Sequence, residues 1–251
     1  MSLNEAAIRL LSCPPAIQQE IIRYAAGLAD LLGDRLPALY LYGSLARGCF
    51  HEQTSDVDTI ALLSEPASEH EMAEILTVHQ QTTIPVDALF VTESQACLNI
   101  FPAPIAFLVK PMDGGKIVIP RDGSRDFLLQ RQDAWEAGVA LCGPPPGEVL
   151  QPVPWPVLEM SLEYLCPYIV THFKNPVLML CRIAHAFTFR RLCGKAQAGI
   201  WATSAFDLRW NTLINEALTD YRQGVRRQLC RETLSAFEQY CMEFILRTRD
   251  C

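Results

Sequence analysis

Two aspartates separated by one residue, Asp56 and Asp58, stand at the start of the apolar run Val57–Leu63. Side chains at i and i+2 of a strand lie on one face, so both carboxylates are expected to point the same way. Crowded carboxylates repel each other unless a cation lies between them, and hard oxygen ligands beside a phosphate suit Mg²⁺. Upstream, Gly43-Ser44 ends another apolar run, and Gly43 lets backbone amides approach an anion closely. The pattern predicts metal-assisted phosphoryl or nucleotidyl transfer.

A third acidic residue, Asp87, interrupts the apolar segment 84–91, which Pro85 places at a strand start or on an edge strand. A lone carboxylate in a core strand is unfavourable unless a cation pairs with it. One alternative is that Asp87 faces solvent on an edge strand. The other is that it joins the first two aspartates, binding metal or accepting a proton from an acceptor hydroxyl.

The elements that must position these residues follow from hydrophobic periodicity. Strands are expected at 39–42, 57–63 and 84–91, with helices at 16–32 and 67–83. Residues 92–125, rich in Pro and Gly, predict a strand pair plus a loop over the active site. The pattern after this segment is helical, over 125–141, 154–172, 176–192, 196–203, 207–223 and 225–249.

The run Gly143-Pro-Pro-Pro-Gly147 is the clearest linker in the chain and predicts two domains, 1–147 and 148–251.

The composition of the chain indicates which classes of partner and which compartment to expect. The 251 residues are 50% hydrophobic and carry a net charge of −7 without a basic cluster, which argues against nucleic acid as a partner. No apolar run reaches membrane-spanning length, and Met1–Glu5 lacks secretory features. Ten cysteines without CxxC spacing are most simply reduced, which predicts a cytoplasmic protein. Composition leaves the oligomeric state open.

The run Gly43-Ser44, then Gly48, then Ser55-Asp56-Val57-Asp58 resembles the signature of the nucleotidyltransferase superfamily with the polymerase-beta-like fold. The alternative is a polar turn whose carboxylates are solvated or capping. The gap between Gly48 and Ser55 is one residue longer than usual in the family, as a loop insertion would make it. The resemblance implies an α+β protein, with a polymerase-beta-like nucleotidyltransferase domain (mixed sheet with helices) followed by an all-helical bundle.

The second half resembles the bacterial aminoglycoside 3''-adenylyltransferases, which inactivate streptomycin and spectinomycin by transferring AMP from ATP. The matching segments are Leu141–Pro144, Asn175–His185, Gly194-Lys195, Trp201-Ala202 and Asn215–Tyr221. The resemblance implies that Arg182, Lys195 and Tyr221 bind ATP. The chemistry agrees, because a triphosphate needs cationic partners and an aromatic face can stack on adenine.

Each of these residues also has a structural alternative. Arg182 would form a buried ion pair, Lys195 would cap helix carbonyls, and Tyr221 would pack its ring. Arg47, in the loop after Gly43-Ser44, would contact phosphate or form a surface salt bridge, with the salt bridge favoured.

The acceptor pocket departs from the family pattern. The family presents acidic residues and a Trp ahead of the Arg-bearing helix, whereas this chain has Tyr168 and His172 there. Glu159 and Glu163, one helical turn apart, are the remaining carboxylates for a cationic acceptor. A neutral polyol would instead contact Tyr168, His172 and Trp155. The third family acid is usually Glu and is Asp87 here.

The sequence therefore predicts a Mg²⁺-dependent nucleotidyltransferase that moves AMP from ATP to a hydroxyl of a small molecule, most simply an aminoglycoside-like antibiotic. The predicted metal and catalytic residues are Asp56, Asp58 and Asp87, while amides of Gly43 and Ser44 hold the β- and γ-phosphates. The alternative is a nucleotide-binding regulatory or antitoxin-like module without turnover. Neither reading involves nucleic acid or a membrane.

Overall fold

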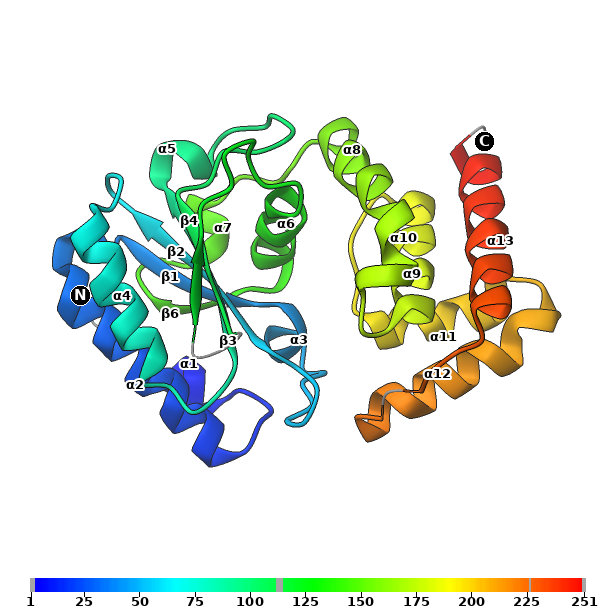
Figure 1. The fold of residues 1–251 in the computed structure, drawn as a ribbon, viewed down its shortest axis with the longest axis horizontal. Coiled ribbons are helices and arrows are strands. Elements are labelled where there is room, and N and C mark those ends of the chain that lie inside the picture. The colour runs from blue at the N-terminus through cyan, green and yellow to red at the C-terminus, as the bar shows by residue number, and fades with distance from the viewer. Residues whose placement is uncertain (1–2, 112–114, 226, 250–251) are drawn as a thin grey trace. The chain divides into compact units, whose positions relative to one another are not determined.

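The computed structural model describes residues 3–111, 115–225 and 227–249. The chain forms two compact units, 1–158 and 159–251, each described here by itself (Figure 1). The division falls inside helix α8 (Trp155–Leu165), whereas the proline-rich composition predicts a boundary after Gly147. In the described ranges, no helix combines the length and apolarity needed to cross a membrane.

The first unit is built on a six-stranded mixed sheet with the order β5-β4-β3-β2-β1-β6. Strands β2 and β3 run parallel, and every other neighbouring pair is antiparallel. The three strands predicted from the sequence are the central ones, and the predicted strand pair in 92–125 is β4 and β5. The strands are β1 (Ala38–Tyr42), β2 (Val57–Leu63), β3 (Val86–Thr92), β4 (Phe107–Lys110), β5 (Lys116–Val118) and β6 (Val139–Cys142).

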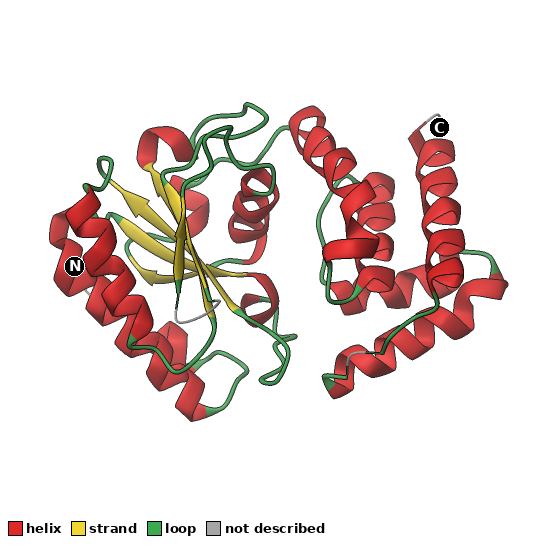
Figure 2. Cartoon of the chain, in the orientation of Figure 1, coloured by secondary structure: helices red, strands yellow, loops and turns green. Residues whose placement is uncertain are grey.

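Helices cover both faces of this sheet. The pair α2 and α4 lies on one face and α6 on the other (Figures 1 and 2). Strand β2 is therefore buried on both sides, which explains its continuous apolar run. The helices are α1 (Glu5–Arg9), α2 (Pro15–Leu32), α3 (Gly43–Ala46), α4 (Glu69–Gln80), α5 (Glu93–Ala96), α6 (Phe127–Ala137) and α7 (Pro146–Val149), with a 3₁₀ turn η1 (Gly33–Arg35).

The core beneath α2 is made by alternate residues of the strands. Ile21 and Leu28 of α2 pack with Leu41, Ala61 and Phe90, each at most 1% exposed. Alternation along the strands sends the intervening residues to the opposite face, toward α6. That opposite face carries the site described below.

The helix predicted over 125–141 is wrong at its end, because α6 stops at Ala137 and Val139–Cys142 is strand β6. Gly138 has an extended backbone, and continuing past it places the apolar run Val-Ala-Leu-Cys beside β1. Short apolar runs of this kind suit a strand as well as a helix, so periodicity alone does not separate them.

All regular secondary structure in the described residues of the second unit is helical, as predicted. Helix α10 is its centre and packs against α11, α12 and α13. The helix predicted over 154–172 is interrupted, because Pro167 lies in a 3₁₀ turn that ends α8. The elements after α8 are η3 (Cys166–Tyr168), α9 (Ile169–His172), α10 (Pro176–Phe189), α11 (Lys195–Ala205), η4 (Leu208–Trp210), α12 (Asn211–Gln223) and α13 (Arg231–Arg249).

Candidate active site

The sheet register places two of the predicted carboxylates side by side. Asp58 of β2 is the register partner of Asp87 on β3 and of Tyr42 on β1. Register partners present their side chains on the same face of a sheet, so all three share the face toward α6. Asp56 lies one residue before the first residue of β2. Residues that are distant in sequence thus form a carboxylate pair at the start of the parallel strands.

Gly43 brings the backbone against this pair. It opens α3 directly after β1 with a φ of 73°, a conformation that L side chains rarely adopt. A Cβ atom at this position would lie 2.2 Å from Oδ2 of Asp58. A side chain at Gly43 would have to displace the Asp58 carboxylate, so the turn formed by Gly43 and Ser44, here called the GS turn, approaches that carboxylate closely.

A buried carboxylate on α6 holds the GS turn from its other side. The N–H of Gly43 donates to Asp133 Oδ2 at 3.0 Å, and Arg47 Nε donates to Asp133 Oδ1 at 3.0 Å. Arg47 Nη2 also lies 3.0 Å from Glu136 Oε2. The Gly43 amide predicted to bind phosphate is therefore bonded to a side chain of the protein in this structure.

The Arg47 pair is more buried than the surface salt bridge predicted from the sequence. The Arg47 side chain is 16% exposed and that of Asp133 is 4% exposed. Burial by itself lowers the pKa of Arg47, but Asp133 and Glu136 outweigh that effect and raise its pKa. Two carboxylates therefore share this guanidinium.

Asp87 has the cationic partner that a carboxylate in a core strand requires. Lys110 Nζ, at the end of β4, donates to Asp87 Oδ2 at 2.7 Å. Strand β3 lies between β2 and β4, and the Asp87 side chain is 20% exposed, so the edge-strand interpretation is wrong. Burial raises the pKa of Asp126, an effect that Lys110 opposes and Asp87 reinforces, which places Asp126 near this pair.

Negative charge is concentrated around Tyr42. Burial raises the pKa of its hydroxyl well above the usual value, and four carboxylates reinforce the shift, those of Asp58, Asp87, Asp133 and Asp126. Such a concentration favours cations, and its oxygen donors are the kind that Mg²⁺ prefers. Within the described residues, no three His, Cys, Asp or Glu side chains are grouped as a complete metal site. The metal role of Asp56, Asp58 and Asp87 stays a prediction.

The predicted nucleotide residues of the second unit lie on three different helices. Arg182 is a partly buried residue of α10 between the buried Cys181 and Ile183, and Tyr221 lies near the end of α12. Lys195 is the first residue of α11. Lys195 follows the end of α10 and begins α11, so its nucleotide-binding role and its capping of the preceding helix both stay predictions.

Arg249, the last residue that the structure describes, pairs with both predicted acceptor carboxylates, Glu159 and Glu163. Arg249 Nε lies 3.0 Å from Glu159 Oε1, its Nη1 pairs with Glu163, and the guanidinium lies over the ring of Phe187. Among the other predicted acceptor residues, Tyr168 is 41% exposed and its ring lies 5.2 Å from that of Tyr164. The side chain of His172 lies outside the described part of the chain.

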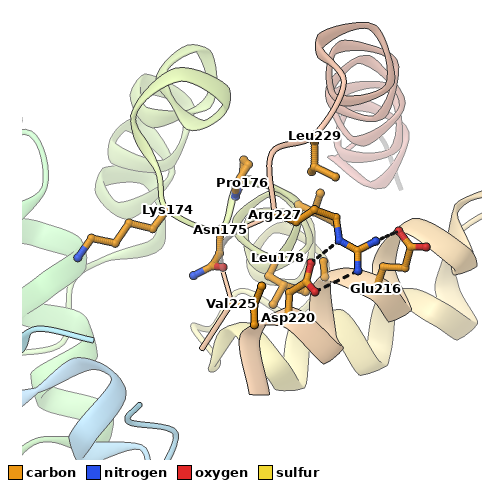
Figure 3. A pocket seen from close by; sticks show the side chains of 11 residues that line it. Lys174, Asn175, Pro176, Leu178, Glu216, Asp220, Val225, Arg227 and Leu229 are labelled. Carbon is orange, nitrogen blue, oxygen red and sulfur yellow. Dashed lines mark hydrogen bonds and ion pairs between the residues drawn. The ribbon is translucent and has the colours of Figure 1, made fainter. Parts of the chain in front are cut away.

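The second unit also contains an open pocket between the start of α10 and the end of α12 (Figure 3). Arg227 projects into it and is held by Glu216 at 2.8 Å and by Asp220 at 3.0 Å. Lys174 and Asn175 form its rim beside the first turn of α10. Its lining residues in the described chain include none of the predicted nucleotide or acceptor residues.

Comparison with known proteins places these features in a family. The model of the aminoglycoside adenylyltransferase C-terminal domain matches residues 148–243, and that of the nucleotidyltransferase domain matches residues 28–108. The chain is an aminoglycoside adenylyltransferase-like nucleotidyltransferase. The family predicted from the sequence is thereby confirmed.

The fold of this adenylyltransferase-like chain is similar to that of spectinomycin adenyltransferase AAD(9) from Enterococcus faecialis, solved with ATP and spectinomycin. The TM-score is 0.75 at 16% identity, and the match covers 91% of this chain and 98% of that one. This likeness confirms the predicted α+β fold. No curated protein matches the sequence.

Sequence reasoning missed three residues around the GS turn of the adenylyltransferase-like chain, Lys110, Asp126 and Asp133. For Lys110 a signal exists, because Asp87 needs a cation and Lys110 ends the strand that follows it. Asp133 carries no such signal, since its helix mixes apolar and polar residues without a clear stripe.

Proposed function

We propose that the chain transfers AMP from ATP to a hydroxyl group of an aminoglycoside-like antibiotic in the cytoplasm, with Mg²⁺. The observation that carries the proposal is the approach of the GS turn to the Asp58–Asp87 pair. Family models on both units and the fold of a neighbour solved with ATP and spectinomycin support the donor and the class of acceptor.

The residues at the site fit a divalent cation. Asp58 and Asp87 are adjacent carboxylates, and the Lys110 ammonium on Asp87 shows that the pair attracts positive charge. We assign Asp58, Asp87 and the preceding Asp56 to Mg²⁺. Held by these carboxylates, Mg²⁺ would supply positive charge that offsets the charge of the phosphates and of the leaving pyrophosphate.

The protein's own groups position the reactants. We assign the backbone and hydroxyl donors of Ser44, the residue after Gly43 in α3, to the phosphate oxygens. Arg47 is already neutralised by two carboxylates, so the triphosphate draws its other positive partners from Arg182 and Lys195, with Tyr221 against the adenine. Asp87 either completes the metal site or accepts the proton of the acceptor hydroxyl, and in both roles its pairing with Lys110 fixes the orientation of its carboxylate.

The acceptor is assigned to a cationic class on the family precedent, with Glu159 and Glu163 as its carboxylates and Tyr168 and His172 beside them. Because Arg249 pairs with both glutamates, a cationic acceptor must compete with a guanidinium of the chain. The glutamates bind a cationic group in this structure, and Arg249→Ala would leave them to a cationic acceptor.

The test is pyrophosphate release from Mg²⁺-ATP with a panel of aminoglycosides, spectinomycin and neutral polyols. Asp58→Asn should lower the rate with the best acceptor by about a thousandfold, on the order of 4 kcal/mol, while the melting temperature changes little. Asp34→Asn, the same change at an exposed position of the same unit, is the matched control. Wild-type rates in Asp58→Asn, or no release with any acceptor, would contradict the proposed function.

A further inference from the structure

The N–H of Gly43 is a donor at the first position of α3, and such donors have no partner within their own helix. Asp133 Oδ2 accepts this hydrogen bond at 3.0 Å. The carboxylate is 4% exposed and belongs to α6, far from Gly43 in sequence. A charged acceptor makes this bond stronger and more directional than the water that would otherwise solvate the amide.

The same peptide unit contacts the predicted metal ligand. Gly43 is the point at which the backbone comes so close to Asp58 that a Cβ would overlap Oδ2. A displacement of this peptide by even half an ångström changes the space between Asp58 and Ser44. Asp133 therefore fixes the distance between the donors of the GS turn and the carboxylates across from them.

Helix α6, which carries Asp133, is itself held in place by several hydrogen bonds. Beyond Arg47, the polar network continues from Glu136 to Gln132 Nε2 at 2.9 Å, and Gln132 Oε1 accepts from the Val153 amide at 2.8 Å. On the same helix, the fully buried Arg131 donates to the carbonyls of Ala96 and Leu98. Supporting hydrogen bonds of this kind hold a functional group in place with little freedom.

We propose that Asp133 is a positioning residue for nucleotide binding, which it serves by holding the Gly43 amide and Arg47 and so fixing the GS turn against Asp58. This inference rests on the proposed function, because it assigns the nucleotide phosphates to the GS turn. Asp133 stays bonded to Gly43 when nucleotide binds and does not itself contact the nucleotide.

The experiment compares Asp133→Asn with Glu136→Gln by calorimetry with ATP and Mg²⁺, well below the melting temperature of each variant. Both changes remove one negative charge from the Arg47 cluster, but only the first touches Gly43. Loss of one charge-assisted hydrogen bond should raise the Kd of Asp133→Asn for ATP about tenfold and that of Glu136→Gln less than twofold. Equal effects of the two variants would overturn the inference.

Hydrogen exchange of the wild-type Gly43 amide provides the second measurement and needs no variant to fold. The amide should exchange slowly both without nucleotide and with ATP and Mg²⁺ bound. Loss of its protection on nucleotide binding would show that Asp133 is displaced, which would overturn the inference alone. Absence of ATP binding to the wild-type chain would overturn the proposed function and this inference together.

Discussion

The ion pairs that involve predicted site residues differ in burial between the two units. In the first unit, Asp133 and Arg47 are 4% and 16% exposed and meet at the backbone turn of the site. In the second unit, Arg249 pairs with Glu159 and Glu163 at a side-chain exposure of 39% for the arginine. A buried pair that also bonds a backbone amide sets geometry, whereas a half-exposed pair is weak and screened by salt.

This contrast separates two kinds of predicted functional residue. The residues around the GS turn are held by register, close packing and buried hydrogen bonds, so substitutions there should alter chemistry strongly. Those of the second unit lie on helix surfaces or at helix ends, where a substitution should change affinity in smaller steps. The predictions below follow that order.

The largest effect is expected for Gly43→Ala, which should lower AMP transfer by at least about a hundredfold, or roughly 2.7 kcal/mol. The new Cβ would overlap Asp58 and require the strained positive φ of 73°. Two control variants separate the overlap with Asp58 from the backbone strain. Gly48→Ala has positive φ without a close neighbour, and Gly147→Ala has neither problem. Rates measured with the best acceptor should fall only in Gly43→Ala, and equal rates in Gly43→Ala and Gly48→Ala would contradict the role of Asp58.

Next in size, Arg182→Ala and Lys195→Ala should each weaken ATP binding by about tenfold, because each removes a charge-assisted contact of roughly 1.5–3 kcal/mol. Calorimetry with ATP and Mg²⁺ measures this. The melting temperature without ATP serves as the control, since a structural arginine on α10 would destabilise the nucleotide-free protein. Normal ATP affinity in both variants would show that Arg182 and Lys195 of the helical unit do not bind ATP. Nucleotide binding would then be assigned to the first unit.

Arg249→Ala should give a moderate effect that depends on the role of the glutamates. Removing two half-exposed ion pairs should reduce stability by about 1 kcal/mol, or roughly 2–4 °C in melting temperature. If Glu159 and Glu163 also bind a cationic acceptor, Arg249→Ala should lower its KM severalfold. The double change Glu159→Gln and Glu163→Gln should raise that KM and weaken its dependence on salt.

An unchanged acceptor KM in both Arg249→Ala and the double glutamine variant would leave these glutamates with a structural role alone. The ATP Kd of both variants is the control and should match the wild type.

The smallest effect concerns one buried histidine in each unit, His79 and His185, each 4% exposed. Burial lowers the pKa of His79, which Asp87 partly opposes, while burial and then Arg191 lower the pKa of His185. Each folded-state pKa lies below the unfolded value of about 6.5. Their stabilisation is therefore complete above pH 6.5 and is lost as pH falls from there through the lowered folded pKa values.

Urea unfolding at pH 7.5 and pH 5.5 measures this loss, which is at most about 1.4 kcal/mol per unit of pKa shift. The double change His79→Gln and His185→Gln should reduce the difference between the two pH values. His70→Gln, at a side chain that is 83% exposed, should leave the difference as in the wild type.

Sequence reasoning found what depends on short segments. The strands around Asp58 and Asp87 and the helices predicted over 16–32 and 176–192 all follow from local periodicity. It did not find β6, because Val139–Cys142 is a strand only through its pairing with β1. Asp133 was missed for the same reason, since its partner Gly43 is distant in sequence.

Residue types alone also gave wrong predictions for the burial and the ion-pair partners of some side chains. Arg47 was expected on the surface, but two carboxylates from α6 bury it, and a single sequence does not show which helix will cover a loop. Glu159 and Glu163 lie on one helix, as their spacing predicts, but their partner Arg249 comes from the far end of the chain and gave no signal in the sequence.

The position of β6 in the sheet affects the order in which the strands can pair while the chain is being synthesised. Strand β1 gains β2 as a neighbour soon after both have been synthesised, but its other neighbour is β6, near residue 140. Pairings between segments so distant in sequence form late, because the intervening chain must first close a long loop. On the ribosome, the carboxylates of β2 and β3 therefore emerge well before α6 and β6. A chain arrested before Asp133 contains Asp56, Asp58 and Asp87 but cannot hold the GS turn against them, so we expect nucleotide-binding competence to arise only after the first unit has been completed.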